Sequence, residues 1–328
     1  MDQNRKVSIE DLTDLCTPWC VHVVATLRIA DHIESGVTEL GRLAIAAECD
    51  TDSLGRVLRH LIKKGVFLEP ERGHFALNDP ARELLDSGGR MFLDLNGIGG
   101  RMAHAWGTLL AVVRTGAPSY QKLFGRPFWE DLDANPEVAS TFNALMGPLG
   151  HGIPDHEILV DRDWDRVKSI VDVGGGTGGM LSEILRNHPS LSGTLVDLPS
   201  TIAQAAGTFQ ISGVADRATL IGQSFFEPLP AGAEIYLLNK VLNDWPDSET
   251  IAILRCCAQA ARPHGRIIIM GGVTPDDTPP SLTVEMVLLG GKTNTLTEFR
   301  EIALEAGLEI TSTGRQPTGR FIVECRPT

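Results

Sequence analysis

The chain has 328 residues, which is enough for two domains that each bury their own hydrophobic core. Its formal net charge of −13 argues against a nucleic-acid partner, because an acidic chain has no field that attracts phosphates. The six cysteines form no C-x-x-C pair and show no metal-ligand spacing with histidine, so we expect reduced thiols in a cytoplasmic protein. No apolar run approaches the length of about 18 residues that crosses a membrane, so we expect no membrane partner.

Residues 11–33 predict a helical stretch that is apolar on most of its surface. A helix of this kind needs burial on more than one side. In a small module, the second covering surface is naturally another copy of the chain. The stretch therefore predicts a homodimer.

Residues 39–77 predict two helices followed by a hairpin. Residues 39–48 are alanine-rich and form the first helix, and the second begins with Asp52 or Ser53 as its cap. The apolar face of the second helix has the spacing i, i+3, i+4, i+7 and i+8, at Leu54, Val57, Leu58, Leu61 and Ile62. Short apolar runs flank a turn at 70–73 and predict the hairpin. This order is that of a winged helix, and we assign residues 1–88 to a winged-helix dimerisation domain.

The second helix of this module also carries basic residues: Arg56, Arg59, Lys63 and Lys64. A winged helix that binds DNA would use such side chains. They equally fit the solvated face of an amphipathic helix, and the acidic chain favours that interpretation.

Residues 89–160 predict a helical connector between two modules. The segment bears aromatic side chains and has glycine–proline breaks at 116–118 and 125–127. We expect it to join the modules and to form the roof of the site.

From about residue 165 onward the chain alternates strands with helices. Strands are expected near 169–173, 192–196, 217–221, 234–239 and 265–270, with a final hairpin at 308–315 and 319–325. This alternation predicts a mostly parallel, Rossmann-like sheet with helices on both faces, in an α/β domain over residues 161–328. Ligands of such sheets bind beyond the carboxyl ends of the strands.

The most informative motif is a glycine-rich turn within residues 170–180, IVDVGGGTGGM. A β-branched strand precedes the turn and a helix follows it. The glycines let backbone N–H groups and the helix N-terminus approach a ligand closely. Asp197 lies about 20 residues further along, at the end of the next strand, where a carboxylate binds the hydroxyls of a ribose. The motif predicts a nucleoside-cofactor site.

Two classes of cofactor fit this turn. Gly174, Gly176 and Gly179 satisfy the G-x-G-x-x-G pattern of nicotinamide dinucleotides, and a bare structural turn is a further alternative. Asp172, however, places a carboxylate two residues before the first glycine, where it would repel a pyrophosphate. A carboxylate there suits a cofactor with an amino group near the turn. We therefore expect S-adenosylmethionine (SAM) or S-adenosylhomocysteine.

The whole chain resembles the winged-helix, homodimeric SAM-dependent O-methyltransferases. That family includes plant caffeate-type enzymes and bacterial relatives acting on aromatic polyketides, naphthoates and phenazines. The motifs that carry the resemblance are VDVGGGTGG at 171–179, VDLP at 196–199, GQSFF at 222–226, LNKVLNDW at 238–245 and GGK at 290–292. The resemblance implies a class I SAM-dependent methyltransferase fold behind an N-terminal winged-helix domain, and a small aromatic or polyketide-type substrate.

The resemblance also implies which residues surround the cofactor. They are Asp172, Gly174 and Gly176 at the methionine part, Asp197 with Leu198 at the ribose, Ser224 and Phe225 at the adenine, and Asn239 and Trp245 on the sheet side. Many relatives have an acid at the position of Ser224, which puts one adenine hydrogen bond in doubt. Trp245 equally fits a core aromatic residue.

Three departures from the family pattern concern the reaction. Relatives that methylate phenols have His-Asp-Trp where this chain has Asn243-Asp244-Trp245, and that histidine is the general base. An asparagine amide does not act as a base near neutral pH, although it donates and accepts hydrogen bonds. Gly271 and Thr293 replace the two acids that orient the histidine in the plant enzymes. The base and its orienting acids are therefore absent together.

Several reactions remain compatible with these departures. Methyl transfer depends mainly on the alignment of donor and acceptor, and an acceptor that is already ionised or bears a lone pair needs no strong base. Alternatively, the fold keeps SAM without transferring its methyl group, as in relatives that hydroxylate or cyclise their substrates. We favour methyl transfer. A ligand-sensing winged-helix regulator is the remote alternative and would need a basic recognition face.

Other residues are candidates to replace the missing base. Asp244 is the acid that remains in the usual catalytic segment, although it also fits a helix cap. The roof contributes His104, His151 and His156, and His151 ranks first because glycines flank it. We expect no metal, because no His, Asp or Glu pair has ligand spacing on a recognisable element.

Overall fold

The computed structural model describes residues 8–146, 154–278 and 284–328. The chain forms two compact units, Met1–His104 and Ala105–Thr328. The expected connector, residues 89–160, is shared between these units, and its treatment as a separate domain stays a prediction. Among the described helices, none combines the length and the apolar character that crossing a membrane requires.

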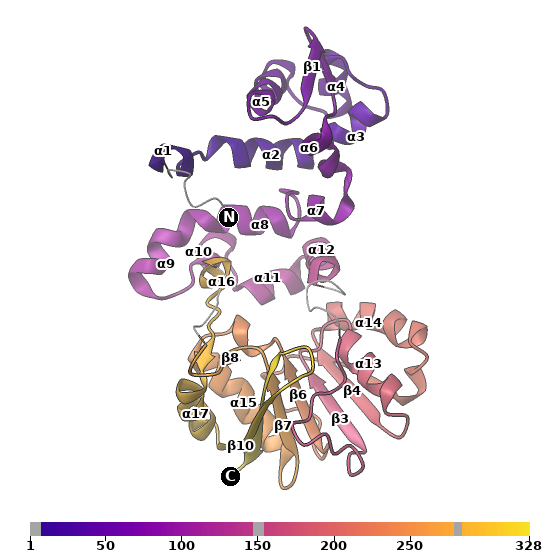
Figure 1. The fold of residues 1–328 in the computed structure, drawn as a ribbon, viewed down its shortest axis with the longest axis vertical. Coiled ribbons are helices and arrows are strands. Elements are labelled where there is room, and N and C mark those ends of the chain that lie inside the picture. Colours follow the sequence, from indigo (N-terminus) through magenta and orange to yellow (C-terminus); the bar gives the residue numbers. More distant parts are fainter. Residues whose placement is uncertain (1–7, 147–153, 279–283) are drawn as a thin grey trace. The chain divides into compact units, whose positions relative to one another are not determined.

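The N-terminal unit is mainly helical. Its helices are α1 (Ile9–Leu12), α2 (Cys16–Thr26), α3 (Ile29–Glu34), α4 (Leu40–Ala46), α5 (Thr51–Lys63), α6 (Asp79–Arg82), η1 (Glu83–Leu85), α7 (Ser87–Met91) and α8 (Ile98–Ala105). Its strands, β1 (Leu68–Glu71) and β2 (His74–Ala76), pair antiparallel. The elements α4, α5, β1 and β2 occur in the predicted order (Figure 1). The winged-helix assignment built on that order stays a prediction.

Local backbone features explain two differences from the sequence-based expectation. The stretch 11–33 is not one helix, because Arg28 adopts a left-handed conformation with φ of 55° between α2 and α3. The cap of α5 is Asp50, and the prediction of Asp52 or Ser53 was wrong. Asp50 has the extended backbone that a cap requires, and its side chain accepts a hydrogen bond from the backbone N–H of Ser53.

The core of the N-terminal unit confirms the periodicity of α5. Leu54, Leu58 and Leu61 are buried there, together with Val24 of α2 and Phe75 of β2. The opposite face of α5 is solvated, as the amphipathic pattern predicts.

The C-terminal unit contains the large sheet. Its helices are η2 (Trp106–Thr108), α9 (Leu109–Thr115), α10 (Tyr120–Phe124), α11 (Phe128–Ala134), α12 (Pro136–Met146), α13 (Gly179–Asn187), α14 (Pro199–Ile211), η3 (Ala215–Arg217), η4 (Leu242–Asp244), α15 (Asp247–Ala261), α16 (Val284–Leu289) and α17 (Leu296–Glu305). Its strands are β3 (Ser169–Val173), β4 (Ser192–Asp197), β5 (Ala218–Gly222), β6 (Ile235–Asn239), β7 (Arg266–Met270), β8 (Val273–Thr274), β9 (Asn294–Thr295), β10 (Leu308–Arg315) and β11 (Phe321–Pro327).

The sheet has seven strands in the order β10-β11-β7-β6-β3-β4-β5. The strands β5, β4, β3, β6 and β7 run parallel, whereas β11 pairs antiparallel with β7 and β10 with β11. The predicted α/β class, the strand positions and the final hairpin are confirmed. The strand order reverses between β3 and β6, which is the switch point where open α/β sheets bind ligands.

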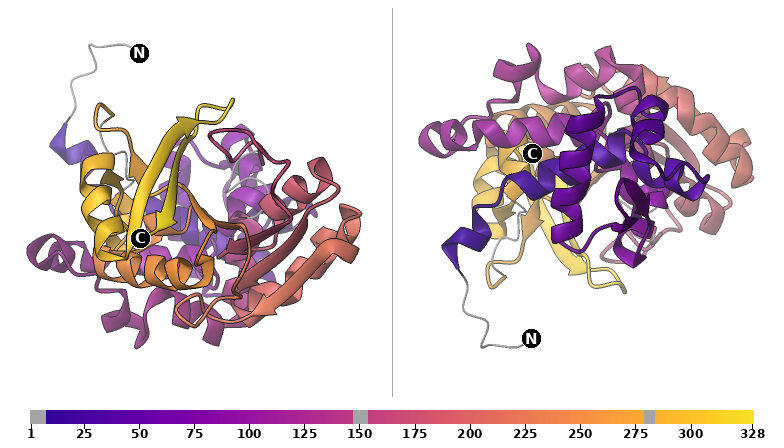
Figure 2. Two further views of the ribbon diagram at one scale, coloured as in Figure 1. Left: turned by 90° about the horizontal axis from the view of Figure 1, so that it is seen from below. Right: turned by 90° about the horizontal axis from the view of Figure 1, so that it is seen from above.

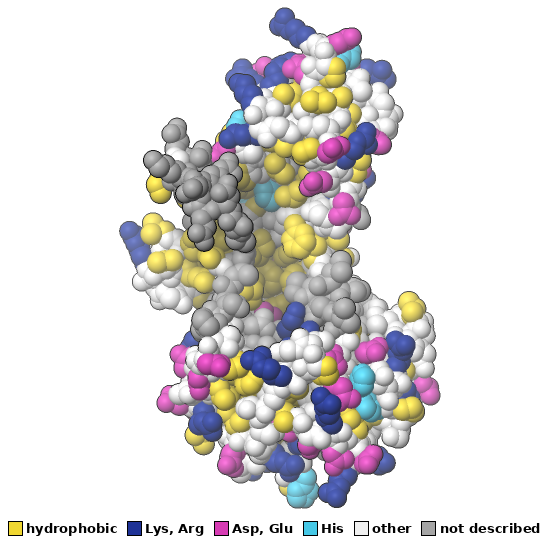
Figure 3. Space-filling view, viewed as in Figure 1, with side chains coloured by type: hydrophobic (Ala, Val, Ile, Leu, Met, Phe, Trp, Pro, Cys, Tyr) yellow, Lys and Arg dark blue, Asp and Glu magenta, His cyan; other side chains and the backbone are white. Residues whose placement is uncertain are grey.

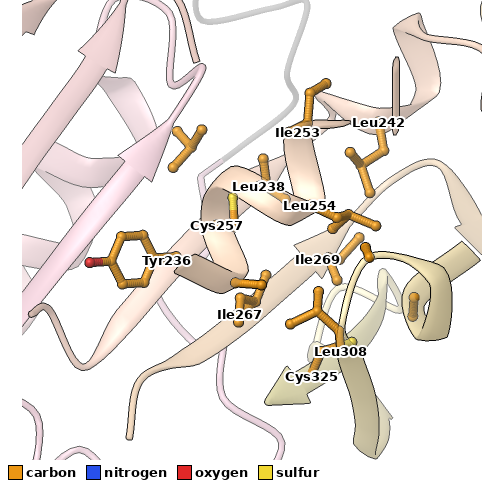
Figure 4. Close-up of a cluster of buried hydrophobic side chains, with 14 of the residues drawn as sticks. Tyr236, Leu238, Leu242, Ile253, Leu254, Cys257, Ile267, Ile269, Leu308 and Cys325 are labelled. Carbon is orange, nitrogen blue, oxygen red and sulfur yellow. The ribbon is translucent and has the colours of Figure 1, made fainter. Parts of the chain in front are cut away.

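Helices α15 and α17 cover one face of the sheet. Leu238 of β6 and Ile269 of β7 pack there with Ile253 and Leu254 of α15, as Figure 4 shows. The hairpin of β10 and β11 continues the sheet beside these helices, and its yellow strands are visible in Figure 2. This layer gives the carboxyl end of β6 a rigid support.

Helices α13 and α14 cover the other face. Leu237 of β6 and Leu195 of β4 are fully buried against Leu181 of α13 and Phe209 of α14. Because side chains on both faces of the sheet are buried, the central parallel strands have nearly continuous apolar sequences. On the outer surface, acidic and basic side chains alternate over the visible face of this unit (Figure 3).

Candidate functional site

The glycine turn follows β3 directly and requires glycine for its backbone. Gly174, Gly176 and Gly178 have φ values of 70°, 61° and 81°, which side chains rarely adopt. A Cβ atom on Gly174 would lie 2.9 Å from Cγ2 of Val241 and 3.2 Å from Cε1 of Phe225. The turn is therefore held against the segments that follow β5 and β6, at the carboxyl edge of the sheet.

Asp172 is a fully buried acid in β3, two residues before the turn. Neither carboxylate oxygen has a hydrogen-bond partner among the described residues. Burial, followed by repulsion from Asp197, raises the pKa of the Asp172 carboxyl to about 7. A buried acid in this state favours the approach of a positively charged ligand, which would supply the missing counter-charge.

Asp197 ends β4 and holds the glycine turn in place. Its Oδ2 accepts a hydrogen bond from the N–H of Gly176 at 2.8 Å, and its Oδ1 accepts one from the N–H of Leu198 at 2.8 Å. Desolvation raises the pKa of Asp197, while these two hydrogen bonds act in the opposite direction. Because each carboxylate oxygen has two lone pairs, acceptor capacity remains for the hydroxyls of a ribose.

An aromatic wall lies beside the turn. The ring of Trp245 meets Phe225 edge-on, with 5.9 Å between the ring centroids, and meets Phe226 edge-on at 5.1 Å. On its other side, the ring of Trp129 on α11 stacks with Trp245 at 6.2 Å. Trp245 is half-buried, so it belongs both to the core and to this wall. Such surfaces bind flat aromatic groups, including a purine.

Ser224 comes just before this wall in the sequence. Among the described residues, its hydroxyl accepts a hydrogen bond but donates none. Its Oγ accepts a hydrogen bond from the N–H of Phe226 at 3.3 Å. An acid at this position would only accept hydrogen bonds, whereas a hydroxyl both donates and accepts them. The contact between Ser224 and an adenine stays a prediction.

Asn239 ends β6 and is almost fully buried. Its Oδ1 accepts a hydrogen bond from Arg320 at 3.4 Å. The next residue, Lys240, has a left-handed backbone with φ of 58°. Burial and the nearby Arg320 lower the pKa of Lys240, and Asp244 opposes that effect. Sequence reasoning singled out neither Lys240 nor Arg320. Arg320 comes from the distant β10–β11 hairpin, so its approach to Asn239 and Lys240 has no signal in the sequence.

Asn243 and Asp244 interact directly within η4. The Nδ2 of Asn243 donates a hydrogen bond to Oδ1 of Asp244 at 2.7 Å, which is the orientation a carboxylate partner requires. The buried Oδ1 of Asn243 has no partner in the described chain. Burial raises the pKa of the Asp244 carboxyl to about 7, against the opposing effects of Lys240 and Asn243. This pKa lies in the range that suits proton transfer near neutral pH.

Gly271, one of the two positions that the resemblance assigns to orienting acids, lies against Asn243. A Cβ on Gly271, where φ is 91°, would lie 3.2 Å from Oδ1 of Asn243 and 3.1 Å from Cα of Lys240. A Cβ on Gly291, two residues before Thr293, would lie 2.5 Å from the backbone oxygen of Asn243. A side chain at Gly271 would therefore meet both the backbone of Lys240 and the amide of Asn243.

The structure gives contacts for two of the three histidines proposed as replacement bases. His151 lies outside the described residues. His104 belongs to the N-terminal unit, where its ring packs 5.2 Å from that of Trp19. His156 pairs with Glu157, with 3.2 Å between Nε2 and Oε1. A catalytic role for His104 or His151 stays a prediction.

The chain matches a protein-family model and several characterised proteins. A family model for the O-methyltransferase domain matches residues 106–309. The chain is 39% identical to a 2,7-dihydroxy-5-methyl-1-naphthoate 7-O-methyltransferase of Streptomyces carzinostaticus over 93% of each chain. It is 37% identical to an aclacinomycin 10-hydroxylase of Streptomyces purpurascens, over 95% of this chain and 86% of that protein.

Solved structures include a similar fold with ligands bound. An O-methyltransferase from neocarzinostatin biosynthesis was crystallised with S-adenosyl-L-homocysteine and 1,4-dihydroxy-2-naphthoic acid. It matches this chain with a TM-score of 0.86 and 37% identity, over 99% of this chain and 100% of that one.

Proposed function

Because this chain belongs to the O-methyltransferase domain family, we propose that it transfers the methyl group of SAM to an oxygen of a small aromatic natural-product intermediate. It has the class I SAM-dependent methyltransferase fold with a mostly parallel central sheet, and SAM is its cofactor. The observation that carries the proposal is the buried carboxylate of Asp172 beneath the glycine turn, which has no hydrogen-bond partner among the described residues.

The residues present fit SAM. Asp172 would provide the negative charge opposite the cationic methionine part, and Gly174 and Gly176 would let the backbone approach it. Asp197 would accept hydrogen bonds from the ribose hydroxyls, and the wall of Phe225 and Trp245 would cover the adenine. When bound, SAM supplies an electrophilic methyl group on a sulfonium.

The protein's own contribution to methyl transfer is alignment of the acceptor. Effective alignment lowers the barrier without a strong base when the acceptor oxygen is already ionised. For an acceptor that arrives protonated, we propose Asp244 as the proton acceptor, because its pKa of about 7 leaves it partly ionised near neutral pH. Asn243 would hold Asp244 through its amide. Its buried Oδ1, which has no partner among the described residues, would accept a hydrogen bond from the substrate.

The substrate class rests on the relatives. One is named for a dihydroxynaphthoate, and a structural neighbour binds a dihydroxynaphthoic acid. A hydroxynaphthoate or a related fused aromatic acid is therefore the first substrate to test. The expected cytoplasmic location stays a prediction.

We further propose that the protein is a homodimer, with no nucleic-acid partner. Leu12 and Leu15, at and just after the end of α1, are 68% and 77% exposed, which favours a covering surface from a second copy. Two of the basic residues of α5 have acidic partners within the unit: Arg56 pairs with Asp52 and Arg59 with Glu69.

A second candidate function is hydroxylation with SAM retained. The relative named as a 10-hydroxylase is nearly as similar to this chain as the naphthoate methyltransferase is. The missing histidine also fits a reaction in which the methyl group is not transferred.

The function can be tested by incubating the purified protein with SAM carrying a labelled methyl group and a panel of hydroxynaphthoates. We expect mass spectrometry to detect product carrying the label, and Asp172→Asn to lower its yield. Product without the label would support the second candidate. No product from any hydroxylated aromatic acid, with SAM bound, would contradict the proposed substrate class.

A further inference from the structure

Two cysteines and a histidine come together in the N-terminal unit, away from the glycine turn in the sequence. Cys16 and Cys20 lie one turn apart on α2, and His60 lies on the neighbouring helix α5. The two Sγ atoms and a ring nitrogen of His60 lie within 4.8 Å of one another. Two thiols and an imidazole form a typical ligand set for a thiophilic metal ion.

The spacing of the sulfur atoms fits metal coordination better than a disulfide. The Sγ atoms of Cys16 and Cys20 are 3.9 Å apart. Two thiolates bound to one tetrahedral Zn²⁺ at about 2.3 Å lie about 3.8 Å apart. A disulfide requires an S–S distance of about 2.05 Å, so the two sulfurs would have to move much closer together on the same helix.

A chain of hydrogen bonds holds the imidazole in place. The hydroxyl of Thr17 donates its single hydrogen to Oδ2 of Asp14 at 2.6 Å, and Nε2 of His60 lies 2.8 Å from the same hydroxyl oxygen. That oxygen must therefore accept its second hydrogen bond from Nε2–H, which leaves the lone pair of the ring on Nδ1. Metal-binding histidines are commonly oriented in this way by partners on their other nitrogen.

Asp14 is itself fixed by surrounding groups. Its Oδ1 accepts hydrogen bonds from the backbone N–H groups of Cys16 and Thr17, and its Oδ2 pairs with Lys64 at 2.8 Å. These contacts define the first turn of α2, where Cys16 lies. The ligand positions are thus supported from both helices.

We propose that Cys16, Cys20 and His60 form a binding site for a thiophilic divalent metal ion of the Zn²⁺ type, which ties α2 to α5. Cys16 is exposed and Cys20 is buried, so the ion would be reached from solvent on one side, and water would complete its coordination. Binding replaces the thiol protons, which pass to solvent, and involves no change of oxidation state.

The test is a titration of the reduced, chelator-treated full chain with Co²⁺, followed by absorption spectroscopy. We expect saturation at one equivalent with a strong thiolate-to-metal absorption band, and displacement of Co²⁺ by Zn²⁺. Cys16→Ser and His60→Gln should each weaken binding by at least about tenfold. Cys49→Ser removes a thiol of the same unit outside the cluster and should bind like the wild type.

Thermal unfolding provides an independent readout. Zn²⁺ should raise the Tm of the wild type and of Cys49→Ser, but not that of Cys16→Ser. Because Cys16 is exposed, its serine variant should have the wild-type Tm in the presence of chelator. A wild type that does not saturate with Co²⁺, or a Cys16→Ser variant that binds as tightly as the wild type, would overturn the proposal.

Discussion

Asp172 is completely buried, and neither of its carboxylate oxygens has a partner in the part of the chain that the structure describes. Its pKa in the folded chain, about 7, lies above the ordinary value of 3.8 that applies to the unfolded chain. Between these two pH values the folded state binds more protons than the unfolded state, so the stability of the ligand-free protein falls as the pH rises through that window. A cation bound beside Asp172 would offset this loss of stability.

We predict that Asp172→Asn stabilises the ligand-free protein against thermal unfolding more at pH 8 than at pH 5, while weakening SAM binding by at least about tenfold. The measurements are Tm at both pH values and calorimetric titration with SAM. Asp216→Asn changes an exposed acid of the same unit and should alter neither quantity. Unchanged SAM affinity in Asp172→Asn would remove Asp172 from the site.

Asp244 is the acid that we assign to proton transfer, and its role should depend on the acceptor. We predict that Asp244→Asn slows methylation of a phenol that is protonated at the assay pH, but not of an acceptor that is already ionised. For the protonated acceptor, the rate of the wild type should rise with pH through about 7, where Asp244 loses its proton, and the variant should lack this step.

The comparison is made with two acceptors of different pKa, from the pH dependence of kcat. Equal slowing of both acceptors would show that Asp244 acts only in the structure of η4. A step at the pKa of the acceptor in both proteins would contradict proton transfer to Asp244.

The glycine turn is the element whose backbone is most constrained by its function. We predict that Gly174→Ala lowers the free energy of unfolding by about 2 kcal/mol, because a left-handed backbone must carry a side chain that collides with Val241. SAM affinity should fall with it, since the turn moves. Gly207 lies in α14 with open space around its Cβ position. Gly207→Ala should therefore raise stability by up to about 1 kcal/mol and leave SAM affinity unchanged, in denaturant unfolding and SAM titrations.

The strands and the glycine turn could be predicted from sequence because their signals are local. The β-branched run of β3 and the glycines after it lie within eleven residues, and the strand predictions agree with the structure to within about two residues. The cap of α5 could not be placed correctly, because Asp50, Asp52 and Ser53 are all good caps and only the backbone conformation selects Asp50.

Contacts between distant segments carried no signal in the sequence. Arg320 reaches Asn239 across 81 residues, and His60 reaches Thr17 across 43. Lys240 lies inside a recognised motif, but the neighbouring cation Arg320 is visible only in the fold. Chemistry that depends on such pairs follows from tertiary packing and requires the structure.

At the scale of the whole molecule, the exposed leucines at the N-terminus should determine the oligomeric state. We predict that Leu12→Glu combined with Leu15→Glu converts the dimer to a monomer in light scattering, because charged side chains oppose burial of this surface. Ile211 is 91% exposed at the end of α14, and Ile211→Glu should leave the dimer intact. A wild type that is monomeric at micromolar concentration would contradict the dimer.

We propose that the methyl group of SAM is consumed although Asn243 stands where relatives that methylate phenols have a histidine. The most direct measurement is the ratio of S-adenosylhomocysteine released to product formed, in a reaction of the wild type with a hydroxynaphthoate. We predict a ratio of one to one. Product that accumulates without release of S-adenosylhomocysteine would contradict it.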